Sequence, residues 1–127
     1  MVAAAVFAAA AVASAPVSAS ALARPGATAA CRASAAVPQR ACDTLVKIDA
    51  GQWPPADAPG TKGGTSWPNR DQALRVADDG GKPIRYQEWD VNPKQLRKSR
   101  DGERIVTGDD GSAWYSADNS RGFARMR

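Results

Sequence analysis

The residues best suited to chemistry lie in the last third of the chain, where one carboxylate stands near two arginines. Glu88 lies within a strand-like run, where β propensity alone would not select glutamate. Arg100 and Arg104 follow it, on either side of an Asp-Gly turn. These groups suit a phosphodiester, because guanidiniums stabilise charge on phosphorus-bound oxygens and a carboxylate accepts a proton from an attacking hydroxyl. The simpler alternative is a surface salt bridge.

Short strands would bring these groups together. In residues 84–91 the period-two alternation places Tyr86, Glu88 and Asp90 on one face. The same pattern predicts further strands at residues 104–108, 113–116 and 122–126. The sequence Asp-Asp-Gly at 109–111 predicts a turn, because glycine accepts the positive φ of a tight reversal. Such a meander buries one face and leaves the other open for a site.

The segments before these strands are expected to support them. Residues 37–50 predict a helix, with Ala41, Leu45 and Ile48 on one stripe and Gly51 at its C-terminal end. Residues 52–66 are rich in proline and glycine and predict a loop with little regular structure. Residues 72–83 read as a connector that ends in a turn at 78–81.

Four separate motifs carry a resemblance to a known family. They occur in order across roughly residues 38–126: Trp67-Pro68-Asn69-Arg70-Asp71, Tyr86-Gln87-Glu88-Trp89-Asp90-Val91, Arg100-Asp101-Gly102-Glu103-Arg104-Ile105-Val106-Thr107-Gly108, and Tyr115-Ser116-Ala117-Asp118 with Phe123 beyond it. In this order and spacing the chain resembles the microbial guanyl-specific ribonucleases of the barnase type. One such motif would be weak, whereas four in register are specific.

The resemblance implies a role for each group. Glu88 would be the general base that takes the proton of the ribose 2′-hydroxyl, and Arg100 and Arg104 would bind the phosphate. The loop Asn69-Arg70-Asp71, entered through Trp67, would bind guanine. The family usually has glutamate where this chain has Asp71, so guanine preference is implied less firmly than RNA cleavage.

The chain differs from the family at the position of the general acid. The family places a histidine directly after the aspartate that aligns with Asp118, to protonate the departing 5′-oxygen. Here Asn119 and Ser120 follow, and the chain contains no histidine. Asparagine cannot release a proton near neutral pH. The expectation is impaired turnover, unless Asp118 with a raised pKa or a water molecule supplies the proton.

The N-terminal region predicts export. Residues 1–23 contain no charged side chain and read as a secretory signal peptide, so the protein is expected to be secreted. A membrane anchor is disfavoured because Pro16 and several serines interrupt the apolar run. Residues 24–36 read as a flexible arm and residues 37–127 as the ribonuclease-like domain. In an exported protein the pair Cys31 and Cys42 suggests one disulfide, with free buried thiols as the alternative.

Charge favours a polyanionic partner. The 127-residue chain has 17 basic and 13 acidic side chains, for a net charge of +4. Five bases fall within a short segment: Lys94, Arg97, Lys98, Arg100 and Arg104. A solvated basic loop would look the same.

The combined expectation is an α+β domain with one or two N-terminal helices packed on a twisted antiparallel β-sheet. Its function would be that of a secreted endoribonuclease that cleaves single-stranded RNA 3′ of guanosine through a 2′,3′-cyclic phosphate. No metal or cofactor is expected, and the expected partners are RNA and a barstar-like inhibitor protein, with the protein itself a monomer. The alternative is a catalytically degenerate module that binds RNA or an inhibitor without turnover.

Overall fold

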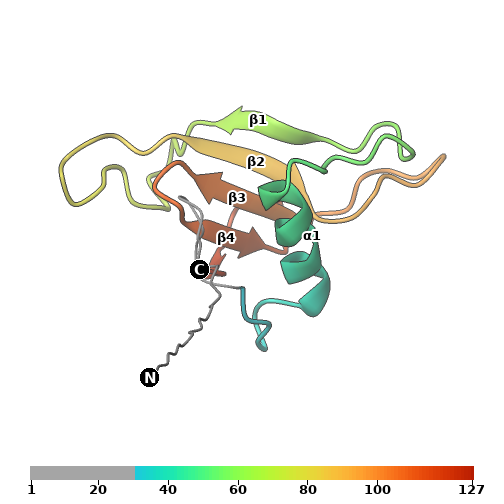
Figure 1. The fold of residues 1–127 in the computed structure, drawn as a ribbon, viewed down its shortest axis with the longest axis horizontal. Coiled ribbons are helices and arrows are strands. Elements are labelled where there is room, and N and C mark those ends of the chain that lie inside the picture. The colour runs from blue at the N-terminus through green and yellow to red at the C-terminus, as the bar shows by residue number, and fades with distance from the viewer. Residues whose placement is uncertain (1–30) are drawn as a thin grey trace, which may run out of the picture.

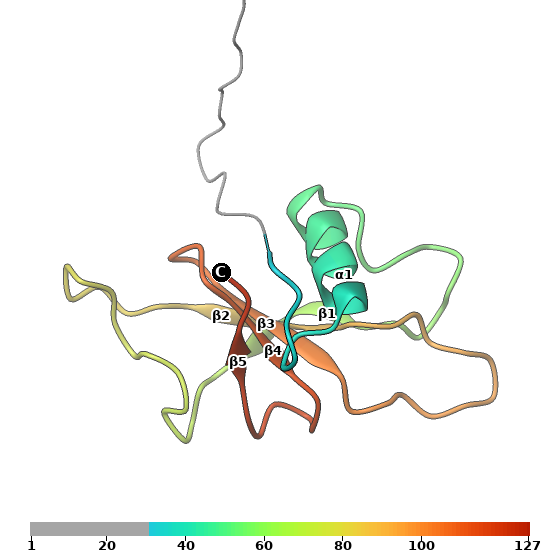
Figure 2. The same ribbon diagram turned by 90° about the horizontal axis from the view of Figure 1, so that it is seen from below.

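The computed structural model describes residues 31–127. It contains one helix, α1 (Gln39–Asp49), and five strands: β1 (Gly63–Trp67), β2 (Tyr86–Asp90), β3 (Arg104–Gly108), β4 (Ala113–Ser116) and β5 (Ala124–Arg125). The strands form one antiparallel sheet in the order β1-β2-β3-β4-β5. The helix packs on one face of this sheet (Figures 1 and 2). The predicted α+β fold is confirmed, with a single helix in residues 31–127. The predicted signal peptide and most of the arm lie outside the described residues.

The helix ends as its sequence predicts. Gly51 has a φ of 72°, and its N–H donates to the carbonyl of Ile48, while the N–H of Gln52 donates to that of Lys47. This pair of bonds is the Schellman motif, which needs a residue with positive φ just beyond the helix. Near the helix start, a disulfide joins Cys42 to Cys31. The segment before α1 is thereby tied to the helix.

The prediction of an irregular loop at residues 52–66 was wrong at its end, because β1 begins at Gly63 and pairs with β2. A Cβ atom at Gly63 would lie 2.7 Å from the Trp89 ring, so glycine lets the strand pass over this indole. Gly64 has a φ of 75°, and the pairing register shifts between Gly63 and Thr65. A strand built on two glycines and a bulge has no alternation to detect.

Two apolar clusters lie on opposite faces of the sheet. The larger one joins the helix to the strands and includes Leu45, Ile105 and Tyr115. The smaller one lies at one end of the other face, where Trp67 packs edge-on against Tyr86 and Phe123. The rest of that second face carries polar side chains. In residues 31–127 the helix α1 is too short and too polar to cross a membrane.

A polar bridge reinforces the contact between the helix and the sheet. Arg40 of α1 donates through both Nε and Nη2 to the Glu103 carboxylate, at 2.7–3.1 Å. The amide of Asn92 and the hydroxyl of Tyr115 also donate to Glu103. The bond from Arg40, with those from Tyr115 and Asn92, lowers the pKa of Glu103 to about 2.

This low pKa predicts acid sensitivity. A carboxyl whose pKa is lower in the folded state stabilises the fold above its unfolded pKa of about 4.3 and loses that contribution as pH falls toward 2. Because Arg40 is exposed and solvent screens the pair, we expect a loss on the order of 2 kcal/mol in the free energy of unfolding. Urea denaturation of wild type and Glu103→Gln from pH 7 to pH 2 measures it. The two curves should converge at low pH, and parallel curves would contradict this assignment.

Candidate active site

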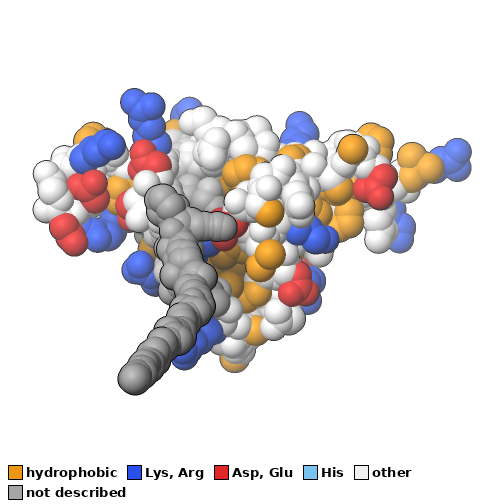
Figure 3. Space-filling model, in the orientation of Figure 1, with side chains coloured by type: hydrophobic (Ala, Val, Ile, Leu, Met, Phe, Trp, Pro, Cys, Tyr) orange, Lys and Arg blue, Asp and Glu red, His pale blue; other side chains and the backbone are white. Residues whose placement is uncertain are grey.

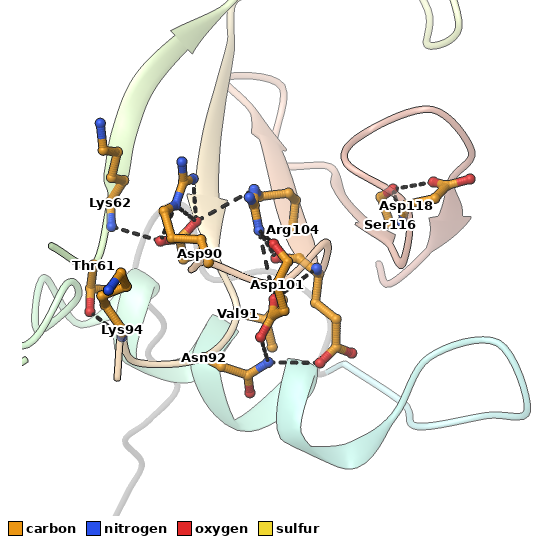
Figure 4. A network of polar contacts seen from close by, with 12 residues as sticks. Thr61, Lys62, Asp90, Val91, Asn92, Lys94, Asp101, Arg104, Ser116 and Asp118 are labelled. Atoms are coloured by element: carbon orange, nitrogen blue, oxygen red, sulfur yellow. Dashed lines mark hydrogen bonds and ion pairs between the residues drawn. The ribbon is translucent and has the colours of Figure 1, made fainter. Parts of the chain in front are cut away.

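The site is built around Asp90, a buried carboxylate at the end of β2. Arg100 grips it with two nitrogens, at 3.0 Å from Nε to Oδ2 and 2.5 Å from Nη2 to Oδ1. The Lys62 backbone N–H donates to Oδ2 at 2.8 Å, and Nε of Arg104 lies 3.4 Å from Oδ1 (Figure 4). Asp90 therefore holds both arginines at one place. The pairing also stabilises Asp90, because a buried carboxylate is tolerated only when it is paired.

The two arginines are fixed in different ways. Arg104 is almost fully buried, and its Nη1 donates to the backbone carbonyls of Asp101 and Glu103. Arg100 remains partly exposed, and its pKa is raised chiefly by the hydrogen bonds to Asp90, with a smaller contribution from the charge of Glu88. Among residues 31–127, no hydrogen bond uses Nη1 of Arg100 or Nη2 of Arg104. These two guanidinium ends are available to an anion.

Glu88 lies on the same face of the sheet as Asp90 and Arg104. It precedes Asp90 by two residues on β2, and Asp90 pairs directly with Arg104 on β3. The sheet thus places Glu88, the predicted general base, near Arg104 on the face that α1 leaves open. Arg100 lies at the same place because it binds Asp90. The Ser120 hydroxyl donates to Oε2 of Glu88 at 2.6 Å. In the described part of the chain neither arginine bonds to Glu88.

The sequence prediction assigned no role to Asp90 or Ser120. For Asp90 a signal was present, because alternation along β2 put it on the face of Glu88. Ser120 carried no signal of its own, since a serine in a polar loop is common. Its position comes from the loop that follows β4.

That loop is held by a buried serine. Ser116 donates to Asp118 at 2.7 Å and accepts the N–H of Ser120 at 2.9 Å. Asn119 and Ser120 both have positive φ, and the N–H of Asn119 donates to the carbonyl of Gly102 at 2.8 Å. Asn119 therefore lies against the turn between Arg100 and Arg104.

Asp118 does not meet the condition set for a replacement acid. Its carboxylate is exposed and accepts hydrogen bonds from Ser116 and from the N–H of Gly122. These bonds, the one from Ser116 first, lower the pKa of Asp118 rather than raise it. The prediction that a raised pKa could let Asp118 protonate the leaving group is wrong, because its bonds favour the charged form.

A cavity of about 230 Å³ lies at the predicted base-binding loop, and Ser120, which bonds to Glu88, is part of its wall. Trp67, Asn69, Arg70 and Asp71 line it, together with Ser120. Asn69 has a φ of 51°, and its side-chain amide bonds to both the N–H and the carbonyl of Leu74. This asparagine shapes the loop instead of facing the cavity with free polar groups. Trp67 packs against the smaller apolar cluster and also lines this cavity.

The chemistry that these residues can offer is charge stabilisation and proton transfer. In residues 31–127 no group of three acidic, histidine or cysteine side chains could hold a metal ion. What the site offers is a carboxylate, two guanidinium ends and an adjoining cavity.

Removing the central charge should loosen the site and the fold. Asp90→Asn keeps the shape of the side chain but removes the buried counter-charge of Arg104 and leaves it only the exposed Asp101, 3.7 Å from Nη1, so we expect a loss of about 2–4 kcal/mol in the free energy of unfolding. Asp79→Asn is the matched control, because the Asp79–Arg75 pair is exposed and should contribute less than about 1 kcal/mol. Urea denaturation at pH 7 compares them. Equal losses in the two variants would refute the central place of Asp90.

The chain is similar to known ribonucleases. Residues 20–127 match the model of the ribonuclease family. The crystal structure of ribonuclease Sa2 with guanosine-2'-cyclophosphate is similar, with 27% identity and a TM-score of 0.51 over 71% of this chain and 86% of that one. A structure of ribonuclease Sa2 in complexes with mononucleotides gives 27% identity and a TM-score of 0.53, over 71% and 84%. No curated protein matches the chain. The family model covers most of the chain, so this protein belongs to the ribonuclease family, in the microbial barnase-type group that its motifs predicted.

Proposed function

We propose that the protein is an exported endoribonuclease that cleaves single-stranded RNA 3′ of guanosine, with slow turnover. The observation that carries this proposal is the placement of Glu88, Arg104 and Arg100 on one open face, beside the cavity at residues 67–71. A base in that cavity would put its own ribose and the following phosphate over Glu88. Family membership supports RNA as the substrate.

The reaction follows from the positions of these groups. Glu88 takes the proton of the 2′-hydroxyl, and the 2′-oxygen attacks phosphorus. The guanidinium ends of Arg100 and Arg104 stabilise the extra negative charge on the phosphoryl oxygens. The bond from phosphorus to the 5′-oxygen breaks, which leaves a 2′,3′-cyclic phosphate that water later opens. Ser120 holds one oxygen of Glu88, so the other is directed at the hydroxyl.

The slow step is protonation of the 5′-oxygen. Asn119 cannot give a proton, and Asp118 is held in its charged form, so water must supply it. Losing a positioned acid typically costs about 10²–10⁴-fold in rate. Guanine preference rests on Asp71, which lines the cavity and whose carboxylate would accept the N1–H and amino hydrogens of the base.

A second candidate function is favoured by Asn119 alone. Without the acid, the protein would bind RNA, or an inhibitor protein of the barstar kind, with no turnover. It would then act as a binding module. One assay distinguishes the two, because only an enzyme forms product.

The proposal predicts Glu88-dependent cleavage of a dinucleotide. The full-length protein is incubated with GpU and with ApU in EDTA, and products are identified by mass spectrometry. Guanosine 2′,3′-cyclic phosphate should form faster than its adenosine counterpart, and Glu88→Ala should lose about 10²–10⁴-fold in rate. Asp79→Asn, which changes an exposed carboxylate outside the site, should leave the rate unchanged. Tight binding of GpU with no product would establish the binding module instead.

Restoring the acid should accelerate cleavage. In Asn119→His we expect kcat to rise by about 10²–10⁴-fold, with a new alkaline fall in rate near pH 6–7 as the imidazole loses its proton. The positive φ at this position suits histidine, which adopts it more readily than most residues. Asn119→Gln is the matched control, because its side chain has no acid and should give no gain. If the histidine variant cleaves GpU at the wild-type rate over pH 5–8, position 119 does not face the leaving group.

A further inference from the structure

The loop at residues 91–101, between β2 and β3, projects beyond the end of the sheet with the loop at residues 54–62 beside it (Figures 1 and 2). Residues 95–101 are all exposed. Leu96 is 87% exposed, and no other large apolar side chain in the described part of the chain exceeds 66%. A single exposed leucine is ordinary on a protein surface. Its surroundings therefore decide whether it has a role.

The side chains around Leu96 are basic. Lys94 precedes it, Arg97 and Lys98 follow it, and none of the three forms an ion pair within residues 31–127. The two neighbouring loops together contain five basic and two acidic residues. Figure 3 shows hydrophobic and basic side chains together at this end of the molecule. The loops therefore present positive charge around an apolar tip.

The two acids do not cancel this charge. Asp101, at the base of the loop, accepts hydrogen bonds from the side-chain amide of Asn92 and from the N–H of Glu103. Asp57, on the neighbouring loop, is a single exposed carboxylate that faces three unpaired basic side chains. The net charge of the tip stays positive.

The tip itself is a defined turn at residues 95–98. The N–H of its last residue donates to the carbonyl of its first at 3.1 Å, and its third residue, Arg97, has a φ of 63°. A positive φ at that place is typical of a type II turn. Leu96 and Arg97 are therefore the two corner residues, and both are exposed. Behind the turn, the N–H of Lys94 donates to the Thr61 hydroxyl at 2.8 Å, so the neighbouring loop supports it (Figure 4).

This combination of side chains suits an anionic lipid surface better than RNA. Single-stranded nucleic acids are held by aromatic side chains on which their bases stack, and residues 91–101 contain no aromatic residue. Leu96 and Arg97 line neither the cavity at residues 67–71 nor the cavity of about 440 Å³ beside Asp90. At a bilayer, a leucine enters the boundary between headgroups and acyl chains while lysine and arginine stay among the phosphates.

A protein partner fits the tip less well. Stable protein interfaces bury about 800 Å² on each side and centre on a broad apolar patch. One leucine on a narrow turn does not supply such a patch, and the neighbouring loop adds only small apolar residues, the prolines and alanines of residues 54–59. A lipid surface makes no such demand, because each side chain inserts by itself.

We propose that the tip at residues 94–98 docks on the surface of an anionic lipid bilayer. Leu96 enters the outer edge of the acyl layer, and the three basic side chains around it bind the headgroup phosphates. This inference does not rest on the proposed function, because it uses none of the residues assigned to catalysis. It is compatible with that function, since Trp67 and Tyr86 pair at the other end of β2 and the cavity there stays open to solution.

Sedimentation with vesicles tests the proposal. The full-length protein is mixed with vesicles of phosphatidylcholine alone or with one third phosphatidylglycerol, at about 0.1 M salt, where the screening length is about 10 Å. Wild type should bind the anionic vesicles about 100-fold more tightly than the neutral ones, because each basic side chain near an anionic surface contributes about fivefold. Arg97→Gln/Lys98→Gln should weaken this binding about 25-fold, and Leu96→Asn about tenfold.

Matched changes at the other end of β2 are the controls. Val76→Asn replaces an exposed apolar residue, and Lys82→Gln/Arg85→Gln removes the same charge as the double tip variant. Both should bind within about twofold of wild type, since they lie beyond the screening length from the tip. Residues 1–23 are kept in every variant, so a difference in binding reports the changed side chains.

Protection from trypsin locates the contact. When about nine-tenths of the protein is bound to anionic vesicles, cleavage after Arg97 and Lys98 should slow about tenfold, while cleavage after Arg75 should not. Mass spectrometry identifies the fragments.

Three results would overturn the proposal: equal binding of wild type to neutral and anionic vesicles, unchanged affinity in either tip variant, or unprotected cleavage at the tip. Tip variants that lose affinity for single-stranded oligouridine but keep vesicle binding would also overturn it, because the tip would then be an RNA contact.

Discussion

The arrangement of the site depends on one buried carboxylate. Asp90 is nearly inaccessible to solvent, and a charge in that position is tolerated only when it is fully paired. Its backbone is fixed as well: its N–H donates to the carbonyl of Lys62, and its carbonyl accepts the indole N–H of Trp53. Through these bonds Asp90, at the end of β2, is connected to Lys62 just before β1, to Arg104 of β3 and to Arg100 of the loop between β2 and β3. Any anion that binds the free ends of Arg100 and Arg104 is binding to groups that Asp90 has already oriented.

This orientation explains why catalysis here would depend on electrostatics more than on acid chemistry. Preorganised guanidiniums stabilise the developing charge whether or not an acid is present. The loop after β4 keeps its shape through Ser116 and through the backbone of Asn119, neither of which needs the side chain of residue 119. The geometry around Glu88 therefore does not depend on which side chain stands at position 119. Ser120 adds a contact to Glu88 that the motifs did not indicate.

The sequence predicted the fold well where its pattern was periodic. Alternation identified β2 and its faces, and Gly51 marked the end of α1. The sequence-based prediction failed at β1, because Gly63 and Gly64 give no alternation. The need for glycine there is seen only in the structure, where the Trp89 ring lies against both residues. The prediction also failed for Asp118, since its pKa depends on hydrogen bonds from Ser116 and Gly122 that form only in the folded loop. The role of Asp90 was also missed, although its face was predicted, because its carboxylate is paired with Arg100, Arg104 and the backbone N–H of Lys62 only in the folded chain.

The central claim is that one phosphate group meets Glu88, Arg100 and Arg104 together while a guanine fills the neighbouring cavity. A crystal structure of the protein with guanosine 3′-monophosphate tests it most directly. The account predicts the phosphate within hydrogen-bond distance of Nη1 of Arg100 and Nη2 of Arg104, the 2′-hydroxyl next to Glu88, and the base among residues 67–71. A nucleotide bound elsewhere, or bound with its phosphate away from both arginines, would contradict it.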